Sequence, residues 1–248
     1  MPSVVFGILY FLIFFEYKGM GSAIYSILNG CGHMWYLPML FWCFVFGWLL
    51  EQVKISDSWK LMILIAFNLF TMIGLPLRIS NALTFMVYFY GGYLFYKNAD
   101  TINIKITTKR IILAWVVFAL CFICFRPLRD VLETSPEQSL WLKIGIRVGN
   151  SMCKLIYVWA GIVSFYVTAV YYTKRHQITG AIKDLSACCF GIYLIQQFVL
   201  QLLYYKTDFP SLVGPYWLPW CGFAIAIISS YIVTKLLLKT KTGKFLIG

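Results

Sequence analysis

The chain has few charged residues, and very few of them are acidic. Of its 248 residues 12% are charged, and 9 Asp and Glu stand against 21 Lys and Arg, which gives a net charge of +12. A soluble domain has about 25% charged and about 45–50% apolar residues, whereas 61% of this chain is hydrophobic. No polar stretch is long enough for a separate soluble domain. We therefore expect lipid to cover part of the surface of an integral membrane protein.

Several chemical signatures are also absent. The sequence has no HExxH, no GxSxG and no cluster with metal-ligand spacing, and its tail KTKTGK lacks the upstream glycine of a phosphate loop. We therefore expect no bound metal or cofactor. The basic residues lie in short loops between apolar runs, a pattern typical of membrane topology rather than of nucleic-acid binding. The sequence thus predicts a lipid bilayer and no nucleic acid as a partner.

The apolar runs predict an all-α protein, a polytopic bundle of about eight transmembrane helices. A spanning helix needs about 20 mostly apolar residues. A weaker candidate covers residues 2–16. The strong candidates are 34–50, 59–77, 82–96, 110–125, 152–173, 185–205 and 216–238.

Loop charge predicts the orientation of these segments. The loops that follow the second, fourth, sixth and eighth segments are the richer in Lys and Arg, so the positive-inside rule places the C-terminus in the cytoplasm. With eight crossings the N-terminus is cytoplasmic too, and His33 opens the second segment from the outer face. The longest polar loop, 126–143, falls on the outer side, either as a plain connector or as a cap over a site.

Polar groups within the apolar segments are the candidates for chemistry, because they are costly in lipid. His33 could act as a general base near neutral pH, or simply be solvated at the interface. Trp35 would flank it as a membrane anchor or as a stacking surface. Arg78 follows GLPL at the outer end of the third segment, where it could bind a carbonyl or anionic oxygen, or reach water.

Later segments carry three patterned sets of polar or small residues. In the seventh segment a polar stripe could bond neighbouring helices or line a cavity. In the last segment small residues recur every four positions and favour close helix packing. The sixth segment has a polar start. The three sets are Ser186, Cys189, Tyr193, Gln196, Gln197 and Gln201; Gly222, Ala226 and Ser230; and Arg147, Asn150, Ser151 and Lys154.

Three stretches, in the right order and spacing, resemble a known family. GHMWYLPMLFWCF (32–44) looks like the HLWFL segment of the acyltransferase 3 family of bacterial membrane acyltransferases. VYFYGGYLFYKN (87–98) is similar to its FFLLGYLL helix, and CFGIYLIQQFVL (189–200) resembles its late SFGIYLLH helix. The resemblance implies a single transmembrane domain over residues 1–248, in a fold that has about ten helices in the family.

The chain departs from the family pattern in two ways. Members begin with an Arg-containing helix that ends in a catalytic His, and no such segment occurs here, so the resemblance implies a chain truncated at its N-terminus and leaves open whether it is active alone. His33 belongs to the HLWFL-like segment and is not that His. Gln196 stands where many members place His, and Gln can hydrogen-bond but cannot shuttle a proton at neutral pH.

The resemblance implies an acyl transfer, often of acetyl, from cytoplasmic acyl-CoA to a hydroxyl of a surface glycan or lipid-linked sugar. We expect a multi-pass protein of the bacterial inner membrane with acyl-CoA as donor substrate. The catalytic candidates are His33, Arg78 and Gln196, and the substrate-binding candidates are Trp35, Tyr193 and Gln197. Two other hypotheses stand beside this one: a flippase-like transporter of glycan lipids, and a non-catalytic membrane partner in surface polysaccharide assembly.

Overall fold

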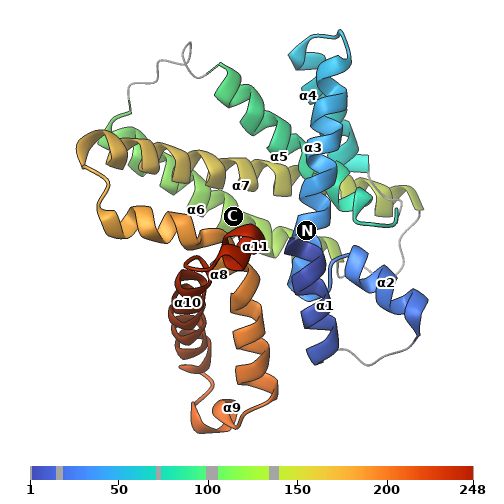
Figure 1. Ribbon diagram of the computed structural model, residues 1–248. Helices are drawn as coiled ribbons and strands as arrows, with labels where there is room; N and C mark the ends of the chain where they lie inside the picture. Colours follow the sequence, from blue (N-terminus) through green and yellow to red (C-terminus); the bar gives the residue numbers. More distant parts are fainter. Residues whose placement is uncertain (1, 15–18, 71–73, 99–105, 134–139, 248) are drawn as a thin grey trace. The chain divides into compact units, whose positions relative to one another are not determined.

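The computed structural model describes residues 2–14, 19–70, 74–98, 106–133 and 140–247 (Figure 1). Within these ranges the side chains of Pro2, Ser3, Phe70, residues 126–133, Leu140 and Lys143 lie outside the description. All regular structure in these ranges is helical, with no strand among the described residues, which confirms the all-α prediction. The chain forms two compact units: unit 1 comprises residues 1–39 and 178–248, and unit 2 comprises residues 40–177.

Unit 1 is built from both ends of the chain, around a pair of packed helices. Helices α8 and α10 run side by side and are joined at one end through the short α9 (Figure 1). The α-helices of unit 1 are α1 (Pro2–Phe14), α2 (Met20–Leu28), α8 (Gly180–Tyr205), α9 (Phe209–Leu212), α10 (Leu218–Leu237) and α11 (Lys241–Ile247). The 3-10 turn η1 (Gly32–Trp35) also belongs to unit 1. It leads into α3 (Tyr36–Gln52), which continues into unit 2.

Unit 2 contains α7 (Leu140–Arg175), the longest helix of the described chain. Helices α6 (Thr108–Glu133) and α7 lie side by side, and α4 (Asp57–Phe70) packs on α5 (Ile79–Lys97) (Figure 1). Ring contacts such as Trp115 on Phe165, with centroids 4.9 Å apart, hold α6 on α7. The indole N–H of Trp115 also donates to the hydroxyl of Thr168 at 2.9 Å.

Each predicted segment overlaps a helix of the structure. The segment predicted at 59–77 overlaps only α4; residues 71–73 lie outside the described residues, and residues 74–78 are not helical. Five stretches are long and apolar enough to cross a membrane: Gly32–Gln52, Thr108–Phe125, Ile144–Arg175, Gly180–Tyr205 and Leu218–Leu237. The chain is therefore a multi-pass membrane protein by helix length and composition. One prediction is wrong in its form: most of the polar loop at 126–143 is helical, because α6 continues to Glu133 and α7 begins at Leu140.

The small residues of the last predicted segment pack as expected. Gly222, Ala226 and Ser230 are buried on α10, together with Thr234. A Cβ added at Gly222 would overlap the Tyr204 ring, and one added at Gly191 of α8 would overlap the side chain of Thr234. Absence of side chains at these two glycines is what lets α8 and α10 approach closely.

Candidate functional site

A tight turn made by two glycines positions His33. Gly30 and Gly32 have φ angles of +79° and +56°, in the left-handed region that favours glycine. A Cβ at Gly30 would come within 2.6 Å of the Met34 backbone oxygen, and one at Gly32 within 2.8 Å of the Tyr10 ring. The turn therefore requires glycine at both positions. It buries Cys31 between them and starts η1 with His33 as its second residue.

Aromatic side chains from two other helices enclose the His33 imidazole. The Tyr10 ring of α1 and the Tyr193 ring of α8 meet it edge-on, with centroids 5.7 Å and 5.4 Å away. The Tyr193 hydroxyl donates a hydrogen bond of 2.7 Å to the backbone oxygen of His33. Tyr10 is held in turn by Phe198 of α8, at 5.1 Å. The imidazole thus sits in a defined place, fixed through its backbone and its ring faces.

Both ring nitrogens of His33 are buried, and neither has a hydrogen-bond partner among the described residues. Backbone groups of Tyr193 and Leu194 face the ring, but neither accepts a hydrogen bond of good geometry. A buried polar group without a partner costs about 1–3 kcal/mol. Such a group calls for an explanation, and a catalytic role is one of the standard explanations. An imidazole of this kind could accept a proton from a bound hydroxyl.

Unit 1 contains five of the six site residues predicted from the sequence. Trp35 meets the ring of Tyr36 at 6.3 Å, and Tyr36 meets Tyr193 at 5.9 Å, so a chain of rings runs from Trp35 to the His33 enclosure. Gln196 and Gln197 are half-buried and lie three and four residues after Tyr193 on α8, which places them one helical turn further along the same side.

The polar stripe predicted on the seventh segment divides along α8. Ser186 and Cys189 are exposed within unit 1, whereas Tyr193, Gln196, Gln197 and Gln201 are half-buried. The fully buried face of this helix is made instead of Cys188, Gly191, Leu194 and Ile195. The half-buried part of the stripe thus begins at Tyr193, the residue that contacts His33, and continues toward the end of α8.

Arg78 belongs to unit 2, where it precedes the first turn of α5. It has a φ of 63° and follows Leu77, which has a φ of 54°. Non-glycine residues rarely adopt this conformation, which costs free energy and occurs most often at functional sites and turns. The Ser80 hydroxyl accepts a hydrogen bond of 2.7 Å from the Leu75 backbone and helps to hold the turn.

Sequence reasoning missed a network of charged and phenolic groups in unit 2. Glu51 and Asp57 face Lys60, at 3.3 Å and 3.8 Å, and Lys97, at 3.9 Å and 3.2 Å. The Asp57 carboxylate, which accepts from the Lys97 ammonium, raises the pKa of Lys97. The scarcity of acids was the available signal, because two of the 9 acids lie only six residues apart.

Two phenols complete this network. The hydroxyls of Tyr90 and Tyr93 donate to the Glu51 carboxylate at 2.6 Å and 3.0 Å. Two acids are thereby matched by two ammonium groups and two hydroxyl donors. Every charge in the network has a partner, and we assign it to stability rather than to chemistry.

The described residues offer no group of three or more His, Cys, Asp or Glu side chains that could hold a metal ion. The aromatic rings around His33 instead suit an organic substrate with a hydroxyl. An unpaired base beside aromatic rings and amide side chains could activate such a hydroxyl by taking its proton.

Comparison with known proteins agrees with the residues that carry the resemblance. A family model described as an acyltransferase domain matches residues 2–239. No curated protein and no solved structure matches the chain. The match covers nearly all of the sequence, including the three stretches at 32–44, 87–98 and 189–200. The chain therefore belongs to the acyltransferase 3 family of integral membrane acyltransferases.

Proposed function

We propose that this chain transfers an acyl group, most simply acetyl, from acyl-CoA to a hydroxyl of a surface glycan or a lipid-linked sugar. The observation that carries the proposal is the His33 imidazole, held between Tyr10 and Tyr193 with both ring nitrogens buried and unpartnered. In a chain of this family, a fixed and unpaired base fits the demands of transfer to a hydroxyl. Loop charge supports a multi-pass orientation in the bacterial inner membrane, with the C-terminus in the cytoplasm.

The reaction needs one base and one group that stabilises an oxyanion. The His33 imidazole takes the proton of the acceptor hydroxyl while that oxygen attacks the thioester carbonyl. A new C–O ester bond forms, the C–S bond breaks, and the CoA sulfur leaves and takes up a proton. Removal of a proton from the attacking oxygen by a positioned base typically accelerates such a step by about 10²–10⁴-fold.

Two polar side chains are proposed for the developing negative charge. Gln196 of unit 1 offers an amide N–H that can donate to an oxyanion. Arg78 of unit 2 is a candidate on the chemistry of its guanidinium alone. Trp35 and Tyr193 offer ring faces for a sugar, and Gln197 offers hydrogen bonds to its hydroxyls. These roles are assigned by side-chain chemistry and by the positions of these residues in their units.

A transfer assay tests the function directly. Membranes that contain the chain, and matched empty membranes, are given radiolabelled acetyl-CoA with a glycan acceptor or with a lipid-linked sugar. We expect label in the acceptor only with the chain. Equal labelling in empty membranes, with both acceptors, contradicts the proposal.

The proposed roles are then separated by substitution. Gln196→Ala and Arg78→Ala should each lower the rate by about 10²-fold or more if the side chain donates to the oxyanion. Trp35→Ala and Gln197→Ala should act mainly on the KM for the acceptor. Full activity in any one of these variants removes that residue from the site.

A further inference from the structure

Unit 2 contains a polar groove on the surface of α6 and α7 that the proposed reaction does not use. It has a volume of about 370 Å³, within the usual range of ligand pockets. Phe125 of α6 and Tyr157 of α7 form an aromatic wall, with ring centroids 4.8 Å apart. The remaining lining residues, all on α7, are Arg147, Asn150, Ser151 and Lys154.

Helical spacing gathers these four polar residues on one face. They recur at intervals of three or four residues, so their side chains point in roughly the same direction. Arg147 and Lys154 are two turns apart, about 10 Å along the axis at about 1.5 Å per residue. Between them Asn150 and Ser151 add neutral hydrogen-bond donors. The face therefore presents a cation at each end and neutral donors in the middle.

The two cations are not explained by ion pairing. No described acid lies within 4.0 Å of Arg147 or Lys154, in contrast to Lys60 and Lys97 of the same unit. Both side chains are exposed. They form part of the apolar stretch Ile144–Arg175, where charge is costly and marks a functional group by default. An anionic ligand would account for their position.

The level at which the groove is expected to lie in the membrane favours a ligand carried by the bilayer. Ile144–Arg175 has 32 residues, more than the about 20 that cross the hydrocarbon core. Residues near its start therefore fall at the level of the lipid headgroups, where long basic side chains can reach phosphate oxygens. Loop charge predicts the outer face for this end of α7.

We propose that this groove binds a phosphate ester carried by a membrane lipid. Guanidinium binds phosphate through two parallel N–H bonds, and ammonium adds a point charge. The aromatic wall suits the apolar or sugar portion next to the phosphate. Two sources share this chemistry: an ordinary anionic phospholipid, and the phosphate that joins a sugar acceptor to its lipid carrier. The second source rests on the proposed function.

Binding to the purified, detergent-solubilised full chain tests the proposal. The probes are a polyisoprenyl phosphate, the matching polyisoprenol without phosphate, phosphatidylglycerol and coenzyme A. We expect the polyisoprenyl phosphate to bind at least about ten-fold more tightly than the alcohol, as charge-assisted hydrogen bonds require. Equal affinity for the alcohol overturns the proposal, and so does tighter binding of coenzyme A that displaces the lipid phosphate.

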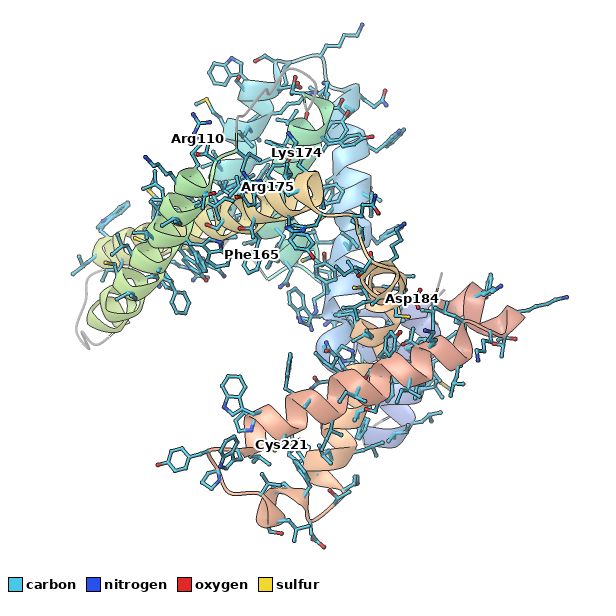
Figure 2. The ribbon with its side chains drawn as sticks, turned by 90° about the vertical axis from the view of Figure 1, so that its left-hand side faces the viewer. Arg110, Phe165, Lys174, Arg175, Asp184 and Cys221 are labelled. Carbon is cyan, nitrogen blue, oxygen red and sulfur yellow. The ribbon has the colours of Figure 1, made fainter. Side chains whose placement is uncertain are left out.

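A matched pair of double variants locates the site. Arg147→Gln with Lys154→Gln should weaken binding by about ten-fold or more. Lys174→Gln with Arg175→Gln removes the same charge from the other end of α7, where Figure 2 labels both residues. This pair should leave binding within about two-fold. Equal weakening by both pairs would overturn the proposal, because it would indicate only a general charge effect.

Two further readouts complete the test. Circular dichroism and gel filtration confirm that each variant is folded, and Arg147→Lys, which keeps the charge but loses the fork, should give an intermediate affinity. Phosphatidylglycerol that binds as tightly as the polyisoprenyl phosphate supports the groove and assigns it to a bilayer lipid. Since binding is measured without transfer, the result is independent of whether the chain shows acyltransferase activity.

Discussion

The two units differ in how they pair one buried ionisable side chain, Lys60 in unit 2 and the ring of His33 in unit 1. Unit 2 pairs the acids Glu51 and Asp57 with two ammonium groups and two phenols, although Lys60 is only 4% exposed. In unit 1, by contrast, both nitrogens of the His33 ring are buried and have no hydrogen-bond partner among the described residues. A paired network contributes to stability when it is complete. An unpaired buried base costs stability and is ready to bind a substrate, so the comparison separates residues that hold the fold from the residue that we propose does the chemistry.

Breaking the paired network should give the largest loss of stability. Lys60→Met leaves Glu51 and Asp57 with Lys97 as their remaining cation, and the cost of breaking a buried pair is about 3–5 kcal/mol. Because the two carboxylates are about one-third exposed, we expect about 3 kcal/mol, at the low end. Reversible unfolding in mixed micelles measures it. Lys235→Met, which breaks the exposed pair with Asp184, is the control and should cost much less.

Disrupting the close packing of α8 on α10 in unit 1 should give the next largest loss of stability. Gly191→Ala adds a Cβ that overlaps Thr234 and comes within 2.9 Å of Ile247, and overpacking of this kind costs about 1–3 kcal/mol. The matched change Gly92→Ala on α5 meets nothing within 4 Å and should be neutral or stabilising by up to about 1 kcal/mol. Thermal unfolding of the two variants, followed by circular dichroism, compares them. Equal midpoints would contradict the packing of α8 on α10.

The hydrogen bond to the His33 backbone should have a smaller effect on stability. Tyr193→Phe keeps the ring contact but removes the hydroxyl that donates to His33, at a cost of about 1 kcal/mol. Tyr204→Phe removes a similar bond, to the Leu218 carbonyl at 3.2 Å, and should cost about as much. Only Tyr193→Phe should also lower the rate of acetyl transfer. A parallel loss of rate in both variants would show that Tyr193 has no positioning role.

Lys97, the exposed cation of the Glu51 network, should contribute least to stability. Lys97→Gln removes two ion pairs near solvent, and exposed pairs contribute little. Because its folded-state pKa is raised, the contribution of Lys97 is fully present below its ordinary pKa and is lost as the pH rises through the raised value. The wild type should therefore differ from Lys97→Gln at pH 7 and converge with it in strong alkali. Unfolding at a series of pH values checks this, and a difference that grows with pH would contradict it.

Most of the fold follows from hydropathy, because an apolar run of sufficient length leaves lipid-exposed backbone few alternatives to a helix. The small residues of α10 also predicted its packing face, since Gly222, Ala226 and Ser230 repeat at a helical interval. The helical extension of α6 through Pro127 was not predicted, because proline and charge usually indicate a loop.

Only part of the candidate site could be predicted from the sequence. His33 stood out as one of two histidines, but its enclosure depends on Tyr10, which lies in a short apolar first segment with no polar pattern. The turn at Gly30 and Gly32 is a property of backbone angles that a short glycine motif does not specify. The Glu51 network joins residues up to 46 positions apart on three helices, as the Lys97 contact shows, and no periodicity predicts such pairing.

One ratio tests the central claim most directly: the rate of acetyl transfer by His33→Ala divided by that of His176→Ala, at equal amounts of folded chain. His176 is the other histidine of the chain, and it is exposed after α7 with its ring stacked on Tyr172. If the imidazole of His33 removes the proton from the acceptor, the ratio should be about 0.01 or lower. A ratio near one would contradict the assignment of His33 as the base.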